Sequence, residues 1–576
     1  MRRPSLLLPC AALIVTLPLL LHGASCGHDF EFHAVSWIDA AAQLRHGVLY
    51  PRWTYTAAFN AGEPRFTFYP PLSWMLGEWL TLLLPLRWVA AAFTWIALTL
   101  TGCTMYRLAR EYAAPVGATA VAMLLLVNPY TLFVAYERTA YAELLATAWI
   151  PLLFRAVLRR QPTVPGVALP VALLWLTNVP AAVMSLYALA ILAAVRIGVE
   201  CFARQQLPAF VLRSVARPVT LGFVLGIAMS AVYLLPVICE QPLVQVHAAL
   251  SAGYQPAANF LFAHTGDPLH DAVLRTASWT AVSLLATLAG VLLTLIVQQS
   301  RAMQPTSSPY ILVTPPVVLA LGLCLMLTRG SLPAWKHLPE LTLLQFPWRL
   351  LAVLAVAIAC LAAKAVSSAR SGGWLLVSLC AVVLLTALSL PRFRQSCDDG
   401  ESLSEHAAEF ARHHGAIYTD EYTVHSADNT ALRPDNPPWW LTNEANAYAP
   451  HTTPNPQALD PLSDDDPEVP EDAVLAATPL DVSMNAPRAE TFVLNLRAYP
   501  HWHVTDNGRP VTLESRDDGL IAFAVPAGVS RIHVSWQQGD DVLLAELLST
   551  LAFAAWLTCC LHERRCRARR IAAPVR

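Results

Sequence analysis

Long apolar segments alternate with short polar ones along most of the chain. Apolar runs of about bilayer length recur up to residue 390, and another covers 542–561. Clusters of arginine, such as Arg107 with Arg110 and Arg159 with Arg160, close every second run. Because basic residues collect on the cytoplasmic side, this pattern predicts about twelve spans with both termini in the cytoplasm.

The first apolar run, Met1–Leu21, opens with two arginines and ends before a Gly-Ala-Ser-Cys sequence. Small residues before a cysteine are also compatible with a cleaved, lipoprotein-like signal. We interpret the run as an uncleaved first helix, because many further spans follow it. The loop after it then lies outside the membrane.

The segment Pro71–Leu84 has two interpretations. It is apolar, but its roughly 14 residues are short for a crossing. Counting it as a span would also move the basic sequence at 107–112 to the outside. We therefore predict a helix that lies in the outer interface.

These patterns predict a polytopic α-helical membrane protein with an extracytoplasmic β-sandwich-like domain. Its parts are a transmembrane domain at 1–390 with a first outer loop at 23–70 and an interface helix at 71–84, an extracytoplasmic domain at 391–541, and a last helix with a basic tail at 542–576.

Alternation of apolar and polar residues begins near Ala489 and predicts short strands, with turns at Asp506-Asn507-Gly508 and two later glycines. The sequence before it, from Arg392 to about Pro487, is predicted to be irregular apart from a helix near 398–415. The acidic run Asp464–Asp466 is predicted to be a solvated loop.

Composition supports the membrane class. The 576 residues are 55% hydrophobic and 14% charged, whereas soluble domains carry about a quarter charged residues. A formal net charge of −2 gives no reason to expect nucleic acid. The twelve cysteines form no CxxC pair and mostly fall in apolar runs, so no disulfide framework or zinc site is predicted.

In the predicted topology the polar motifs lie on the outer face, at His28–Pro70, Tyr136–Glu143, 240–271 and 329–349. The spans contain almost no ionisable residues. Transporters place such groups at mid-bilayer, so the pattern favours an enzyme or a ligand-binding protein of the outer surface.

The first outer loop contains His28, Asp29, Glu31 and His33 within six residues. Carboxylates so placed serve as a general base or hold a divalent cation. In a helix, Asp29 and His33 share a face and Glu31 points away; in an extended segment, Asp29, Glu31 and His33 share one. The alternative without chemistry is that Asp29 only caps a helix.

A second group, Glu137, Arg138 and Glu143, is a candidate site or a structural ion pair. Arg349, one turn into a helix that begins with proline, is placed to bind a phosphate or to reach a lipid headgroup. Arg52 and Arg65 are further phosphate candidates.

Several of these motifs together carry a resemblance. The sequences HDFEFH, HGVLYPRW, YERTAYAELLATAWIPLLF and LPELTLLQFPWRLL resemble a family labelled 6-pyruvoyl-tetrahydropterin synthase-related membrane proteins, although nothing here indicates pterin chemistry. That family is similar to the GT-C glycosyltransferases. The strand region resembles the extracytoplasmic domain of YfhO-like membrane proteins.

The resemblance implies an enzyme of the bacterial cytoplasmic membrane that takes a sugar from a polyprenyl-phosphate donor. The acceptor would be an envelope glycan or protein at the outer face. It implies Asp29 as the catalytic residue with Glu31 in reserve, and Arg138 and Arg349 for the phosphate. It also allows a divalent cation, Mg or Mn, with Asp29 and His33 as candidate ligands. The full substrate-binding set is His28, His33, Arg52, Glu137, Arg138, Glu143 and Arg349.

Two other function classes remain open. One is a non-catalytic membrane scaffold that binds an envelope glycan or partner. The other is a lipid or polymer transporter, against which the scarcity of charged residues in the spans counts.

Overall fold

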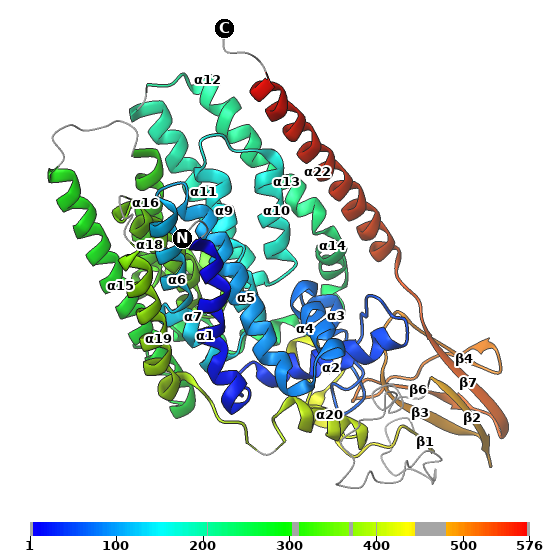
Figure 1. Cartoon of the computed structure of the whole chain (residues 1–576). Coiled ribbons are helices and arrows are strands. Elements are labelled where there is room, and N and C mark those ends of the chain that lie inside the picture. Colours follow the sequence, from blue (N-terminus) through cyan, green and yellow to red (C-terminus); the bar gives the residue numbers. More distant parts are fainter. Residues whose placement is uncertain are drawn as a thin grey trace.

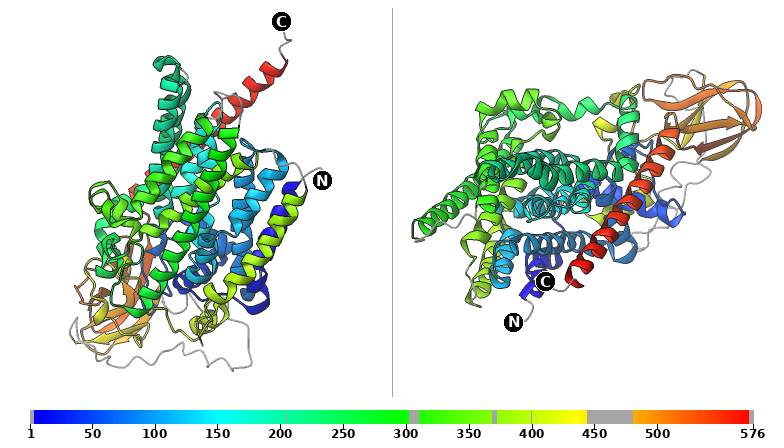
Figure 2. Two further views of the ribbon diagram at one scale, coloured as in Figure 1. Left: turned by 90° about the vertical axis from the view of Figure 1, so that its left-hand side faces the viewer. Right: turned by 90° about the horizontal axis from the view of Figure 1, so that it is seen from above.

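The computed structural model describes residues 4–203, 205–301, 310–367, 372–398, 400–443 and 480–572. A bundle of helices forms most of the molecule, and a β-region lies at one corner of one end (Figures 1 and 2). The acidic run Asp464–Asp466 falls outside the described residues, so its predicted loop is not tested.

Within the described residues, eight helices are long and apolar enough to cross a membrane, or up to ten if two bent pairs each count as one span. The eight contain α5 (Leu86–Ala109), α8 (Tyr141–Ala146) with α9 (Ile150–Leu158), α11 (Val179–Gly198), α12 (Pro208–Val211) with α13 (Arg217–Met229), α15 (Pro268–Arg301), α18 (Leu351–Ala365), α19 (Gly373–Phe393) and α22 (Asp540–Ala572). The bent pairs are α6 (Pro115–Leu126) with α7 (Pro129–Leu132) and its continuation to Arg138, and α16 (Tyr310–Met326) with α17 (Leu332–His337). The chain is therefore a polytopic membrane protein.

The predicted number of about twelve spans is not confirmed. Three apolar helices fall short of the length of a crossing: α1 (Leu7–His22), α10 (Val164–Trp175) and the one at Ala231–Leu243, which contains α14 (Ala231–Glu240). The span predicted at Val219–Ile238 is divided between α13, which ends at Met229, and α14, which begins at Ala231.

The segment predicted as an interface helix forms α4 (Pro71–Leu83). Pro71 opens it at a position where the missing N–H costs nothing. The helix packs against α2 (Phe30–Arg45), where a Cβ on Gly77 would lie 2.1 Å from the Trp37 ring. The helix is thus held by close packing; its depth in the bilayer stays a prediction.

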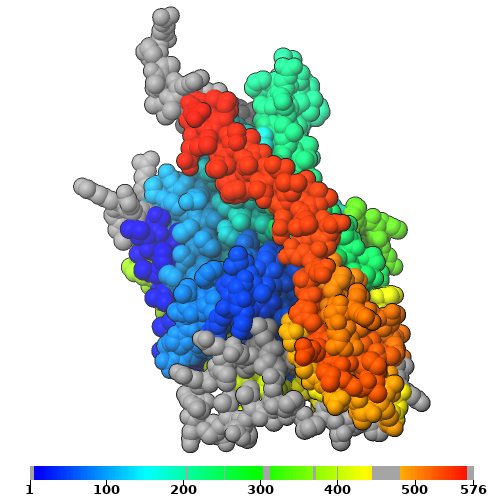
Figure 3. All heavy atoms as spheres, turned by 90° about the vertical axis from the view of Figure 1, so that its right-hand side faces the viewer, coloured from blue at the N-terminus to red at the C-terminus, as the bar shows by residue number. Residues whose placement is uncertain are grey.

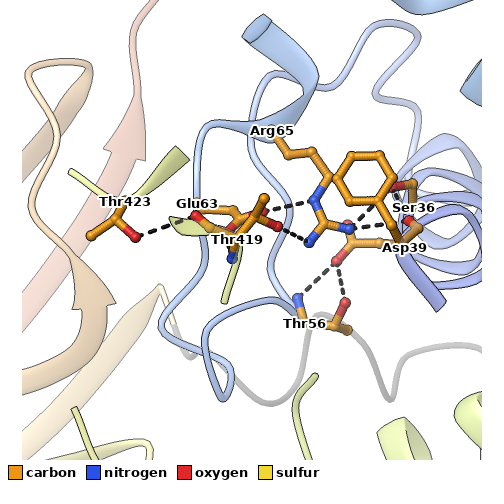
Figure 4. A network of polar contacts seen from close by, with 8 residues as sticks. Ser36, Asp39, Thr56, Glu63, Arg65, Thr419 and Thr423 are labelled. Atoms are coloured by element: carbon orange, nitrogen blue, oxygen red, sulfur yellow. Dashed lines mark hydrogen bonds and ion pairs between the residues drawn. The ribbon is translucent and has the colours of Figure 1, made fainter. Parts of the chain in front are cut away.

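A buried polar network gives the first outer loop its shape (Figure 4). The Arg65 guanidinium, at the start of α3 (Arg65–Phe68), donates to Glu63 Oε1 at 2.7 Å and to Ser36 Oγ at 3.1 Å. It also donates to Thr419 Oγ1 at 3.1 Å, while the Thr419 amide donates to Glu63 Oε2 at 2.9 Å. One buried ion pair therefore joins the loop, α2 and the chain that follows α19.

A second carboxylate inside α2 closes the same loop (Figure 4). Asp39 accepts from the Thr56 amide at 2.8 Å and from its hydroxyl at 2.9 Å, and from Gln43 Nε2 at 2.7 Å. Burial raises the pKa of Asp39, and these donors partly offset the rise. Asp39 is therefore a structural carboxylate whose oxygens are already bonded.

The strands form two antiparallel sheets. One has the order β1 (Trp439–Thr442), β3 (Glu490–Arg497), β6 (Leu520–Val525), and the other the order β2 (Asp481–Ala486), β7 (Gly528–Trp536), β4 (Trp502–Asp506), β5 (Arg509–Pro510). Apolar residues of both sheets share one core, which also takes in Trp53 and Phe68 of the first loop. The β-region is thus sandwich-like and packs directly on that loop.

Turn chemistry accounts for the predicted hairpin. Asn507 and Gly508, between β4 and β5, both have positive φ, at 49° and 77°, as a two-residue hairpin turn requires. Helix α20 (Leu403–Ala411) confirms the predicted helix and begins with a capping box between Ser402 and Glu405. The prediction of irregular chain up to Pro487 was wrong at β1 and β2, whose partners lie far along the sequence.

The prediction of no disulfide was also wrong. Cys26 and Cys397 form a disulfide across 371 residues. Neither belongs to a spacing motif, so only the folded chain brings them together. The bond ties the end of the first helix to the start of the extracytoplasmic region.

The first outer loop and the extracytoplasmic region lie on one side of the molecule. The Arg497 amide donates to the Ala61 carbonyl at 2.8 Å, and Asn60 Nδ2 donates to the His413 carbonyl at 2.7 Å. In Figure 3 the first loop, in blue, lies beside α22 and the strands, in red and orange. These contacts place both predicted outer regions on the same side of any membrane.

Replacing Arg65 tests whether the buried network stabilises the fold. We expect Arg65→Gln to leave Glu63 charged and buried, which destabilises a fold by about 3–5 kcal/mol. Thermal unfolding of the full chain in detergent measures this. Arg412→Gln is the matched control, because Arg412 pairs with Glu409 at 3.2 Å at a half-exposed position and such pairs contribute about 0–1 kcal/mol. Equal midpoints for the two variants would contradict a stabilising role.

Candidate active site

A break in helix geometry precedes the candidate site. Residues Phe133–Arg138 form a π-helical turn that ends at Thr139, whose φ of 49° is left-handed. The helix then restarts as α8. A β-branched residue rarely adopts positive φ, and π-turns recur at functional sites. The irregular backbone places Arg138 at the end of its helix, facing the first outer loop.

The start of the first outer loop packs tightly on this turn. The Asp29 amide donates to the Arg138 carbonyl at 3.0 Å. A Cβ on Gly27 would lie 2.1 Å from the Glu137 carbonyl oxygen, so only glycine allows this approach. The main chains of Asp29 and Arg138 are therefore in contact, in addition to the pairing of their side chains.

Four charged side chains meet there, and we call Asp29, Arg138, Glu143 and Arg349 the outer charge cluster. Arg138 donates to Asp29 Oδ2 at 3.0 Å and to Glu143 Oε2 at 2.7 Å. Arg349 Nε lies 3.7 Å from the same Glu143 oxygen, and the Tyr130 hydroxyl donates to the other one. The Asp29 side chain is 38% exposed, whereas that of Arg138 is 5% exposed. The cluster is therefore buried on one side and open at Asp29.

The structure decides between a helix and an extended segment after Asp29, and between a capping and a pairing role for its side chain. Asp29 stands directly before α2, yet its side chain makes no capping hydrogen bond and turns to Arg138 instead. Because α2 is helical, His33 shares the inner face with Asp29, and Glu31 is exposed on another face near His406. The extended alternative is excluded, and Glu31 lies outside the cluster.

His33 is buried among aromatic rings. Its ring lies 5.3 Å from that of Tyr141 and 5.9 Å from those of Tyr69 and Trp37. Its Nδ1 has no hydrogen-bond partner among the described residues. Burial lowers the pKa of His33 to about 4. The imidazole is therefore neutral at physiological pH and retains an unused nitrogen.

Arg349 is held by a strained turn. Gln345, with φ of 58°, accepts from Arg349 Nη1 at 3.2 Å, as does the Leu344 carbonyl. The guanidinium lies 5.1 Å from the centre of the Phe346 ring, which stacks on Trp348 at 4.5 Å. Its Nε has no hydrogen-bond partner among the described residues. Arg349 is thus fixed in place with donor capacity left over.

Two further residues, Tyr69 and His28, lie at the edge of the outer charge cluster, which we call its rim. Burial raises the pKa of Tyr69, and the negative charge of Asp29 raises it further. Because the phenol interacts electrostatically with Asp29, it faces the cluster. His28 is exposed and interacts electrostatically with Asp29, Arg138 and His270 of α15. The rim therefore draws on parts of the chain more than 200 residues apart.

The remaining predicted site residues lie elsewhere. The Glu137 carboxylate accepts a hydrogen bond from the Gln395 side chain, whereas Arg138 pairs with Asp29 and Glu143. Arg52 is buried with its guanidinium 4.2 Å from the centre of the Tyr50 ring, and none of its nitrogens has a hydrogen-bond partner among the described residues. Arg65 is not a phosphate ligand, because the network of Figure 4 occupies its donors.

Three residues near the cluster, Tyr130, Tyr69 and His270, were not predicted, and their sequence context indicates them only weakly. Tyr130 sits inside an apolar run, where a tyrosine needs a hydrogen-bond partner when buried, and its partner is Glu143. Tyr69 lies in the first outer loop, directly before Pro70 and Pro71. His270 shares a polar segment with other histidines, and only the fold selects it.

Comparisons with known proteins add little. No family model and no curated protein matches the sequence, so the resemblance to the synthase-related family and the GT-C enzymes stays a prediction. Cryo-EM structures of the mycobacterial arabinofuranosyltransferase AftD align with TM-scores of 0.41 to 0.43 at 13 to 15% identity. They match 69 to 72% of this chain, which spans less than a third of that enzyme's length. At these values the likeness carries no argument about activity.

The buried His33 predicts a pH effect on stability. Its pKa is about 4 in the folded chain and 6.5 in the ordinary state, so unfolded chains bind the proton first. The contribution of His33 to the free energy of unfolding is fully present above pH 6.5. It is lost as the pH falls toward 4, by up to about 1.4 kcal/mol per pH unit. We expect His33→Gln to remove this slope, measured as thermal midpoints across that range. The control is His503→Gln, at an exposed position; equal slopes in both variants would contradict the assignment.

Proposed function

We propose that this protein is a membrane glycosyltransferase that moves a sugar from a polyprenyl-phosphate donor to a cell-envelope acceptor. The reaction takes place at the outer face of the cytoplasmic membrane. The observation that supports this most is the outer charge cluster, which combines a partly exposed carboxylate with two arginines at the end of membrane helices.

The two arginines are suited to a phosphate. A guanidinium binds phosphate oxygens in a planar, bidentate manner. Arg349 is the stronger candidate, because its Nε has no hydrogen-bond partner among the described residues and its side chain is not fully buried. Arg138 shares the Glu143 carboxylate with Arg349 and provides a second positive charge next to it. The apolar helices beside them offer a path for the polyprenyl chain in the bilayer.

Asp29 is suited to the acceptor. It is the most exposed member of the cluster, and Arg138 fixes its orientation. A positioned carboxylate that takes the acceptor's proton contributes about 10²–10⁴-fold to rate. We assign this role to Asp29, with His28 and His33 beside it as binding residues.

The reaction is an inverting single displacement. The acceptor oxygen or nitrogen attacks C1 of the sugar as its proton passes to Asp29. The bond between C1 and the phosphate oxygen breaks, and the electron pair leaves with the polyprenyl phosphate. Arg349 and Arg138 stabilise the charge that develops there.

The net charge of the outer charge cluster with a bound donor phosphate favours the participation of a cation. Two carboxylates and two arginines sum to zero, so a donor phosphate brings negative charge that the cluster leaves uncompensated. A divalent cation, Mg or Mn, bound at Asp29 and the phosphate would supply the missing positive charge. We therefore expect transfer to depend on such an ion.

Substitution of Asp29 is the direct test. We expect Asp29→Asn to slow sugar transfer from a polyprenyl-phosphate sugar, measured in proteoliposomes, by roughly 10²-fold or more. The variant keeps the side-chain shape, and Arg138 keeps Glu143 as a counter-ion.

Glu31→Gln is the matched control, because Glu31 is an exposed carboxylate two residues away, and its turnover should stay within about twofold. Unchanged turnover in Asp29→Asn would overturn the assignment of Asp29. Absence of transfer by the wild type with any polyprenyl-phosphate sugar would favour the scaffold. Movement of the lipid between leaflets without a covalent product would favour the transporter.

A further inference from the structure

Three potential metal ligands meet where the β-region joins the membrane helices. Glu240 ends α14, His501 lies between β3 and β4, and Asp541 begins α22. One ligand atom from each lies within 4.8 Å of the others, and no other such trio occurs among the described residues. None of the three belongs to the outer charge cluster.

We propose that Glu240, His501 and Asp541 bind a zinc ion that joins the β-region to the membrane helices. Ligands at about 2.0–2.2 Å from zinc in tetrahedral geometry lie roughly 3.4 Å apart. His501 Nε2 is 3.4 Å from Glu240 Oε1, so this pair already has the required separation. An Asp541 oxygen lies within 4.8 Å of a ligand atom of each of these two residues.

The donor atoms are prepared for a ligand. His501 Nε2 and Asp541 Oδ2 are shielded from solvent, and neither has a hydrogen-bond partner among the described residues. Unsatisfied buried polar atoms are costly, and a cation shared between these two would satisfy both. This is a second observation, independent of the proximity of the three residues.

An ion pair between a protonated His501 and Glu240 explains this arrangement less well than a bound cation does. Its Nε2 approaches Glu240 without hydrogen-bond geometry. One imidazolium would balance only one of the two carboxylates. Among the described residues, no lysine or arginine pairs with Glu240 or Asp541. The local charge is therefore negative and favours a divalent cation.

The surrounding residues hold the ligands in position. The Tyr499 hydroxyl donates to Glu240 Oε2 at 2.6 Å, which leaves Oε1 for the ion. The Trp536 ring lies 5.2 Å from that of His501. Such outer partners orient metal ligands and raise affinity.

Ligand chemistry favours zinc. Calcium and magnesium prefer six or more oxygen ligands, whereas one imidazole nitrogen with two carboxylates suits zinc, with water as a fourth ligand. Since the three residues come from α14, the β-region and α22, the bound ion would crosslink all three. This inference does not rest on the proposed transferase activity.

The test uses the full chain, purified without a histidine tag and stripped with EDTA. We expect about one zinc per chain by mass spectrometry after excess zinc is removed, and a higher thermal midpoint with zinc than with calcium or magnesium. Glu240→Gln and His501→Gln should bind zinc roughly tenfold or more weakly, and Tyr499→Phe should weaken binding by about 10–100-fold.

The controls are Asp540→Asn and His503→Gln, which change exposed neighbours of two ligands and should bind zinc like the wild type. If a ligand variant does not fold, the wild type alone decides the question. No retained zinc and no thermal shift would overturn the proposal. Equal zinc binding by wild type and all ligand variants would overturn it too.

Discussion

The structure around the candidate site depends on the pairing of one buried arginine, Arg138, with carboxylates. Arg138 is almost fully inaccessible, and an unpaired charge at such a site would cost several kcal/mol. Its counter-ions come from two places: Glu143 follows it in the next helix, and Asp29 comes from the first outer loop. The close approach at Gly27 and the hydrogen bond from the Asp29 amide to the Arg138 carbonyl hold the Asp29 side chain next to Arg138. Pairing Arg138 thus places a partly exposed carboxylate at the end of the membrane helices.

The loop that carries Asp29 is in turn supported from outside. Arg65 and Glu63 bind it to Thr419 (Figure 4), and Trp53 packs into the core of the strands. The Cys26–Cys397 disulfide fixes the start of the same loop. The chain between α19 and α22 therefore holds the loop of the candidate site in position. The proposed zinc site would further stabilise the contact between the β-region and the helices.

Local pattern predicted the membrane class, a helix at 71–84, a helix near 398–415 and the strands after residue 489, because each follows from hydrophobic periodicity or turn residues nearby. It also singled out Asp29, Arg138, Glu143 and Arg349. It did not predict β1, β2 or the disulfide, since their partners are distant in sequence. The pairing of Arg138 with Asp29 in place of the adjacent Glu137 depends on a π-turn, which no residue pattern indicated. Tyr130 and His270 join the site for the same reason: only tertiary packing brings them there.

The central claim is that the outer charge cluster binds the phosphate of a polyprenyl carrier. The most direct measurement is a cryo-EM structure of the full chain in lipid nanodiscs with polyprenyl phosphate. The account predicts a phosphate within hydrogen-bond distance of the Arg349 guanidinium and beside Asp29, with the lipid chain lying along the membrane helices. A carrier whose phosphate binds elsewhere, while Arg349 still contacts only Gln345, Leu344 and Glu143, would contradict it.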